Sequence, residues 1–146
     1  SFLFLAGLVV FTDQLTKALA ETFLEGGTSL PVIAQFFHHT LVHNQGIAFG
    51  LIQGAEKILL GVITLSIGLL VVFGLRSHPH QWMTQAGIGL ILGGAVGNWI
   101  DRIRVGAVIV FLDFRIWPVF NFADSAITVG VGLFLLELLR NPNRAS

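Results

Sequence analysis

Long apolar runs, separated by two longer polar segments, dominate the hydropathy pattern of the chain. A helix that crosses a bilayer needs about 20 mostly apolar residues. The pattern therefore predicts four transmembrane helices, over about 2–20, 58–75, 81–100 and 124–139. With four spans, both ends of the chain would lie on one side of the membrane.

The two connections on the opposite side, about 21–57 and 101–123, are long and carry signals for strands. Residues 31–44 are rich in β-branched and aromatic side chains, and a turn signal follows at Asn44-Gln45-Gly46. The apolar stretch 105–112 is too short to span a membrane as a helix. We expect a small β-sheet that lies on the membrane surface.

Composition supports the membrane class. The chain is 54% hydrophobic and 11% charged, whereas soluble domains carry about 25% charged residues. Its 146 residues fit a single domain, 1–146, of an all-α membrane protein. A net charge of zero without a basic cluster argues against nucleic acid as a partner. The lack of cysteine excludes disulfides, thiolate metal sites and a cysteine nucleophile.

Glycines recur at four-residue spacing in the third predicted helix, at Gly89, Gly93 and Gly97. Small residues at this spacing let helices approach closely in lipid. We interpret this stripe as a helix-packing face.

Ionisable residues within predicted spans call for an explanation, because each costs roughly 2.5–3.5 kcal/mol on insertion scales. Asp13 and Lys17 are four residues apart and share a helix face. They either neutralise each other near the helix end or line a polar cavity. Asn98, Asp101 and Arg102 also share a face, and they either end the third helix or brace a site.

A second polar group stands at the entry to the fourth helix, where Asn121 and Asp124 are three residues apart. Either could cap the helix, but we favour a functional role for Asp124. A hairpin could bring Asp113 near it. Two carboxylates held close together share a proton, and the pair can activate water and protonate a leaving amine. This is aspartic-peptidase chemistry, which needs neither metal nor cofactor, although two such groups could equally bind an ion or conduct protons.

Two other functions fit less well. His38 and His39 would point to opposite faces of a strand, so a metal site that they form with His43 is not expected. A small proton-coupled transporter could use Asp13, Lys17 and Asp124. Such a protein should have polar residues along several spans, and the second predicted helix is almost entirely apolar.

Four motifs, in order along nearly the whole chain, resemble those of the lipoprotein signal peptidase family, also called signal peptidase II. They are Asp13-Gln14-Leu15-Thr16-Lys17, Asn44-Gln45-Gly46-Ile47-Ala48-Phe49-Gly50, Gly93-Gly94-Ala95-Val96-Gly97-Asn98-Trp99-Ile100-Asp101-Arg102 and Phe120-Asn121-Phe122-Ala123-Asp124-Ser125-Ala126.

The resemblance implies a four-helix protein of the bacterial inner membrane, with cytoplasmic termini, a small periplasmic β-sheet and a short periplasmic surface segment. It implies an aspartic endopeptidase with its active site at the periplasmic face. The substrates would be prolipoproteins that carry a diacylglyceryl-modified cysteine, cleaved just before that cysteine to release the signal peptide. We expect a monomer whose other partners are membrane lipids, and no cofactor or metal.

The resemblance also implies roles for individual residues. Asp124 matches one aspartate of the catalytic pair, and Asn121 matches a site residue beside it. The positions expected to support the site or contact substrate are Asp13, Lys17, Asn44, Gly46, Asn98, Asp101 and Arg102.

The second catalytic aspartate of the family is not at its expected place. The family carries a Gly-x-Val-Val-Asp-Phe pattern, whereas residues 106–111 read Gly-Ala-Val-Ile-Val-Phe, so that Val110 stands at the aspartate position. Asp113 is the nearest candidate for the missing carboxylate, but residues three apart in a strand face opposite sides. The alternative to an active peptidase is a variant that binds lipoprotein precursors without cleaving them.

Overall fold

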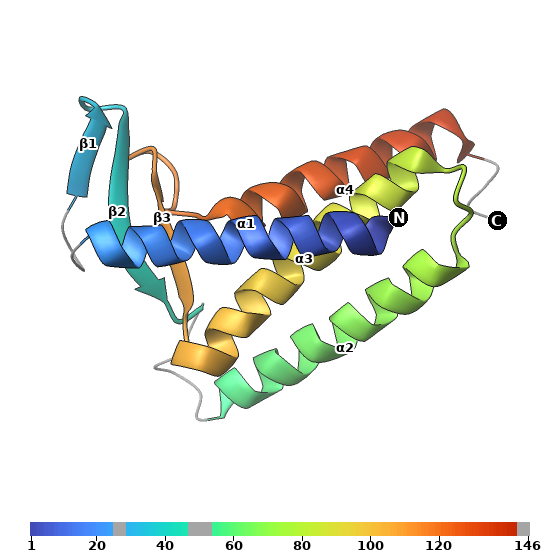
Figure 1. The fold of residues 1–146 in the computed structure, drawn as a ribbon, viewed down its shortest axis with the longest axis horizontal. Coiled ribbons are helices and arrows are strands. Elements are labelled where there is room, and N and C mark those ends of the chain that lie inside the picture. The colour runs from blue at the N-terminus through green and yellow to red at the C-terminus, as the bar shows by residue number, and fades with distance from the viewer. Residues whose placement is uncertain (25–28, 47–53, 143–146) are drawn as a thin grey trace.

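The computed structural model describes residues 1–24, 29–46 and 54–142. In these ranges the chain forms four helices and a three-stranded sheet (Figure 1). The elements follow in the order α1 (Phe2–Phe23), β1 (Ser29–Ile33), β2 (Phe37–Asn44), α2 (Ala55–Arg76), α3 (Trp82–Val105), β3 (Val108–Asp113) and α4 (Phe122–Arg140).

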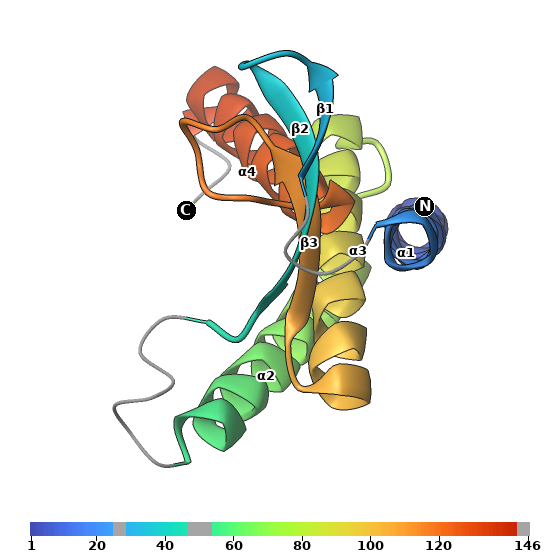
Figure 2. The ribbon, with the colours of Figure 1, turned by 90° about the vertical axis from the view of Figure 1, so that its left-hand side faces the viewer.

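Helix α3 is the centre of the molecule, because it packs against α1, α2 and α4. The sheet lies across the end of the molecule where α1 ends and α4 begins (Figure 1). The start of α1 and the end of α4 both lie away from the sheet. Seen from the sheet end, α1 and α4 lie on opposite sides of the strands (Figure 2).

Three helices in the described part of the chain, α1, α2 and α4, are long and apolar enough to cross a membrane. Helix α2 has little contact with the rest of the protein and exposes almost its whole apolar surface. The third predicted span, about 81–100, is present as the helix α3, which is 24 residues long. It is less apolar because glycines and polar side chains form its contacts with neighbouring helices.

The helix boundaries differ from the predicted ones, most of all at the end of α3. This helix continues to Val105, five residues past the predicted end at about 100, and Gly106 closes it with a φ of 74°. A left-handed residue, usually glycine, is a common way to end a helix. Asp101 and Arg102 therefore lie in the last two turns of α3 and not in the following loop.

The predicted sheet is confirmed, with β2 between β1 and β3 and all pairs antiparallel. In the register of β2 with β3, Val42 is opposite Val110 and His38 is opposite Asp113. After β2, Gly46 has a φ of 95° and donates its N–H to Asn44 Oδ1 at 2.8 Å. The remaining residues of the Asn44–Gly50 motif, 47–50, lie outside the described residues.

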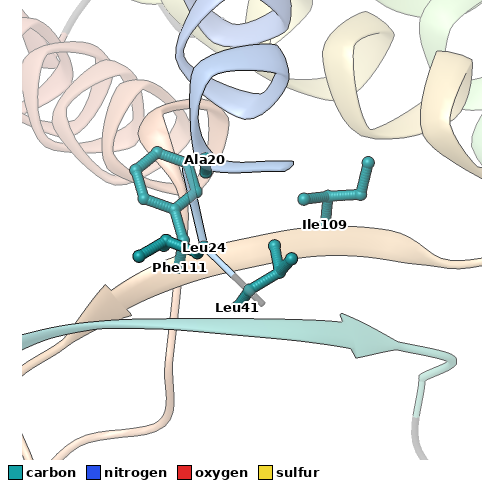
Figure 3. Close-up of a cluster of buried hydrophobic side chains, with 5 residues drawn as sticks. All are labelled: Ala20, Leu24, Leu41, Ile109 and Phe111. Carbon is teal, nitrogen blue, oxygen red and sulfur yellow. The ribbon is translucent and has the colours of Figure 1, made fainter. Parts of the chain in front are cut away.

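An apolar cluster fastens the sheet to α1 (Figure 3). Ile109 and Phe111 of β3 and Leu41 of β2 pack on Ala20 and Leu24 at the end of α1. Because side chains alternate along a strand, Val110 faces the other side of the sheet. Its side chain there borders a cavity together with Pro118 and Val119.

The glycine stripe of α3 packs against α1, as predicted. A Cβ atom at Gly93 would lie 2.5 Å from Val9 Cβ and 2.8 Å from Ala6 O. At Gly97 it would collide with the carboxylate of Asp13. The close approach of α1 and α3 thus requires glycine at these positions, and it also sets where Asp13 lies.

We predict that Gly93→Ala lowers stability by about 1–3 kcal/mol, the usual cost of overpacking a close contact. Thermal unfolding in detergent micelles should show a lower midpoint. The matched control is Gly61→Ala in α2, where nothing lies within 4 Å of the added atom and alanine favours the helix. Equal midpoints for Gly93→Ala and the unaltered protein would contradict the close α1–α3 contact.

Candidate active site

A buried ion cluster of Lys17, Asp13 and Asp101 lies between α1 and α3. Lys17 Nζ is 2.6 Å from Asp13 Oδ2 and 2.7 Å from Asp101 Oδ2. The three side chains are 0–1% exposed. The ammonium also donates to Asn98 Oδ1 at 3.2 Å, so all three of its N–H groups have an acceptor. Asp13 and Lys17 are therefore more than an isolated pair.

Two carboxylates face one ammonium in this cluster, and neutral donors satisfy the remaining oxygens. Asp13 Oδ1 accepts the backbone N–H of Ala123 at 3.0 Å. Asp101 accepts the backbone N–H of Ile109 at 3.1 Å and the Gln14 amide at 3.1 Å. These bonds reach from α1 and α3 to β3 and to the first turn of α4. The ion cluster thus holds together the four elements that surround the candidate site.

Asn98 connects the ion cluster to Asp124. Its Oδ1 accepts from Lys17 Nζ and, at 2.9 Å, from Asn121 Nδ2. Because both neighbours are donors, the amide oxygen must face them and the amide nitrogen must face the other way. Asn98 Nδ2 accordingly donates to Asp124 Oδ1 at 2.9 Å.

Asp124 takes part in a helix cap and in this polar network at once. Asn121 Oδ1 accepts the Asp124 N–H at 2.8 Å, and Asp124 Oδ2 accepts the Asn121 N–H at 3.1 Å, which together form a capping box at the start of α4. The capping interpretation of Asn121 is confirmed. The other oxygen of Asp124, Oδ1, accepts from Asn98, so the cap explains only one of the two carboxylate oxygens.

Asp124 borders a cavity of about 430 Å³, here called the Asp124 cavity. Aromatic side chains form much of its wall, and the rings of Phe114 and Phe120 stack at 5.8 Å. Asp124 is the one titratable residue among the described residues that line it. The others are Phe114, Trp117, Phe120, Ser125, Thr128 and Val129.

A second cavity, of about 410 Å³ and here called the Val110 cavity, lies across the segment 117–120. Trp117 and Phe120 border the Asp124 cavity, whereas Pro118 and Val119 border the Val110 cavity. Asn121 Nδ2 also donates to the carbonyl of Ile109 at 2.9 Å, and that carbonyl belongs to the peptide that leads into residue 110. Position 110 is therefore next to the Asn121–Asp124 network.

Two more of the expected site residues lie at the edge of this region. Asn44 borders the Val110 cavity and holds Gly46 through its side chain. The charge of Arg102, on α3, interacts with Asp124 and with Asp101.

Asp113 is held elsewhere. Its carboxylate accepts the Thr40 hydroxyl at 2.8 Å and the Arg115 backbone N–H at 2.8 Å, and it pairs with the Arg115 guanidinium at 3.4 Å. The Thr40 hydroxyl first, and then Arg115, lower the pKa of Asp113 below its ordinary value. The structure therefore places Asp113 in the sheet with these partners and brings Asn98 and Asn121, not Asp113, to Asp124.

The histidines do not converge. His38 Nδ1 is 2.7 Å from Ser29 Oγ, while His39 packs edge-on against Phe111. His43 Nε2 lies 4.0 Å from Glu21 Oε1 at the end of α1. Within the described ranges, no three histidine or carboxylate side chains gather where a metal ion could sit.

Comparison with known proteins identifies the family of the chain. The family model for signal peptidase (SPase) II matches residues 5–140. The chain belongs to the signal peptidase II family. The members of this family are proteases that remove signal peptides from lipoprotein precursors.

Named relatives cover nearly the whole chain. The lipoprotein signal peptidase of Moorella thermoacetica is 46% identical over 139 residues, which cover 94% of this chain and 92% of the relative. That of Halothermothrix orenii is 40% identical and covers 90% of each chain. A solved structure of a bacterial membrane enzyme is 34% identical, covers 96% of this chain and 93% of its own, and superposes with a TM-score of 0.89.

The sequence patterns missed the backbone donors and the aromatic wall. Nothing in residue type marks the N–H groups of Ala123 and Ile109 as partners of the ion cluster. Trp117 and Phe120 come from a loop without periodicity, so hydropathy gave no reason to place them beside Asp124. The spacing of polar residues, in contrast, predicted the face shared by Asp13 and Lys17 and the face shared by Asn98 and Asp101, but not that the two faces meet in one ion cluster.

We predict that Lys17→Met destabilises the protein by about 3–5 kcal/mol, because it leaves two buried carboxylates without a cation. The midpoint of thermal unfolding in detergent measures the effect. Lys57→Met, on the exposed start of α2, is the matched control and should unfold like the unaltered protein. A Lys17→Met protein as stable as the control would remove the ion cluster from the structural core.

Asp113 should make stability depend on pH in the acid range. Because its pKa is held below the ordinary value of about 3.9, its bonds stabilise the fold above that pH, and this contribution disappears as pH falls through the lower folded pKa. We predict that Asp113→Asn lowers the unfolding midpoint at neutral pH and that the gap closes below about pH 4. Glu56→Gln, at an exposed position, is the control. A gap that does not change with pH would contradict this assignment.

Proposed function

We propose that the protein acts on prolipoproteins that carry a diacylglyceryl-modified cysteine, as an aspartic endopeptidase that cleaves just before that cysteine. The observation that carries the proposal is the Asp124 carboxylate, fixed by Asn98 and Asn121 at the edge of an apolar, aromatic cavity. Such a wall suits lipid and signal-peptide side chains. Membership of the signal peptidase II family supplies the reaction and the substrate class.

We propose further that the chain is one domain with four spans, in which α3 crosses the membrane together with α1, α2 and α4. The central position of α3 among three apolar helices supports this arrangement. The sheet and the site would face the periplasm, with both termini in the cytoplasm of the bacterial inner membrane. The start of α1 and the end of α4 lie away from the sheet, as this orientation requires (Figure 1). We expect a monomer in contact with membrane lipids.

The site residues take three roles in this proposal. Asp124 activates the water that attacks the scissile carbonyl carbon. Asn98 and Asn121 orient its carboxylate, and the ion cluster of Asp13, Lys17 and Asp101 orients Asn98. The residues that would contact the substrate are Asn44, Gly46 and Arg102.

Position 110 limits the reaction in this chain. An aspartate there would face the same side of the sheet as the Asp124 region and could share a proton with Asp124. Valine can neither donate a proton to a leaving amine nor polarise a carbonyl group. Because Thr40 and Arg115 hold Asp113 in the sheet, we propose that Asp113 does not replace the missing carboxylate and that peptide cleavage is slow.

The second candidate function is binding without cleavage, and Val110 is the observation that favours it. The network around Asp124 does not depend on the residue at position 110, so a binding surface would remain intact. The two candidates differ in one measurable quantity, the rate of peptide cleavage by the unaltered chain.

We predict that Val110→Asp raises kcat on a diacylated prolipoprotein peptide by about 10²–10⁴-fold, the usual contribution of one general acid or base. Val110→Asn is the matched control, because it adds polarity of the same size without a titratable carboxyl group, and it should give no gain. Introducing Asp124→Asn into the Val110→Asp protein should abolish cleavage. The variant should still unfold cooperatively, at a somewhat lower midpoint, because its amide NH2 group faces a donor in place of an acceptor.

Cleavage and binding are measured together, in detergent or liposomes, with the same peptide. Slow cleavage by the unaltered chain supports the peptidase, and tight binding with no cleavage supports the second candidate. If the unaltered chain cleaves as fast as Val110→Asp, the second carboxylate is not at position 110. If neither protein binds the peptide, the proposed substrate class is wrong.

A further inference from the structure

We propose that the protein, with its present sequence, hydrolyses carboxylic esters at the Asp124 site much better than peptide bonds. The substrate class is a diacylated lipopeptide in which an ester oxygen takes the place of the scissile amide nitrogen. This inference rests on the proposed function for the placement of the substrate. The inference concerns whether a site with one carboxylate, Asp124, can hydrolyse an ester bond when it hydrolyses a peptide bond only slowly.

The first observation is that Asp124 is arranged as a base. Its Oδ1 accepts from Asn98 Nδ2 and its Oδ2 from the backbone N–H of Asn121. Both of these nitrogens can only donate, so the hydrogen bonds fit a carboxylate ion and give no acceptor for a carboxyl proton. Lys17 and Asn121 fix the amide of Asn98 in the donating orientation. Asp124 is therefore prepared to take a proton from water.

The second observation is that the described residues place no acid opposite this base. Asp124 is the single titratable side chain among the described residues that line its cavity. Among the described residues that border the Val110 cavity, the one titratable side chain is His43, whose Nε2 is directed to Glu21 on the α1 side of the sheet. Asp113 has its own partners in the sheet. The described site thus contains a general base without a general acid.

The chemistry of the leaving group decides what such a site can do. Asp124 removes a proton from water while the water oxygen bonds to the carbonyl carbon, which gives a tetrahedral oxyanion. In an ester, the oxyanion collapses as the C–O bond breaks, and the alkoxide leaves and then takes the proton from Asp124. The products are a carboxylic acid and an alcohol, so one water is consumed and no other reactant is needed.

A peptide bond makes a further demand. The nitrogen must be protonated before the C–N bond breaks, because an amide anion is a far poorer leaving group than an alkoxide. In a two-carboxylate site the second acid supplies that proton. Without it, the available carboxyl proton is the one that Asp124 took from water. Hydroxide is a far better leaving group than an amide anion, so the tetrahedral oxyanion returns to the peptide by expelling hydroxide, which takes that proton back from Asp124. The charge of Arg102, which interacts with Asp124, is available to both reactions and does not distinguish them.

The test uses the chain of residues 1–146 in detergent and two lipopeptides. These differ only in the scissile group, which is an amide NH in one and an ester oxygen in the other. We expect the ratio of kcat/KM for ester over peptide to be at least about 100 times higher in the unaltered protein than in Val110→Asp, the low end of the contribution of one general acid. Asp124→Asn in the otherwise unaltered protein should reduce ester hydrolysis to the rate without protein.

Val110→Asn serves as the matched control and should keep the high ester-to-peptide ratio, because it adds no acid. Ester hydrolysis that Asp124→Asn leaves intact would overturn the inference, and so would equal ratios in the unaltered and Val110→Asp proteins. The proposed function fails by a different result, namely no cleavage of the peptide by Val110→Asp. The comparison of ester hydrolysis by the unaltered and Asp124→Asn proteins does not depend on whether Val110→Asp cleaves the peptide.

Discussion

The burial of a single ammonium group organises this protein. Lys17 lies in a region from which water is excluded, and an unpaired charge there would be very unfavourable. Each of its three N–H groups is therefore given an oxygen, from Asp13, Asp101 and Asn98. The surplus carboxylate oxygens then require backbone donors, and those donors come from the strand and helix that form the site. The hydrogen bonds required by one buried ammonium group thus connect α1, α3, β3 and α4.

The same hydrogen-bond network connects the buried ion cluster to Asp124. Asn98 receives two donors on its oxygen and must therefore present its nitrogen to Asp124. The helix cap formed by Asn121 fixes the other oxygen of Asp124. A carboxylate held at both oxygens keeps one orientation, which is what a catalytic base requires. The glycine contacts between α1 and α3 also position this network, since a side chain at Gly97 would displace Asp13.

Sequence patterns predicted the parts that depend on periodicity. The four helices, the strands before the turn at 44–46, the strand after α3 and the polar face of Asp13 and Lys17 follow from hydropathy and spacing. The extension of α3 to Val105 was not predicted, because two polar residues, Asp101 and Arg102, look like the end of a span. In the structure Asp101 pairs with buried Lys17, and the charge of Arg102 interacts with Asp124. The partners of Asp113 were not predictable, because they depend on strand register and on a loop residue, Arg115.

Val110 lies between two cluster residues of β3, on the face of the sheet turned away from them, and its side chain is 3% exposed. A buried carboxyl at this place would need a partner or a proton, whereas a buried methyl pair needs only contact. The fold therefore has no requirement for an acid at this position. Loss of a carboxylate at this position would leave the packing of the sheet intact. The stability of the fold and the presence of an acid beside Asp124 therefore place separate demands on this one residue.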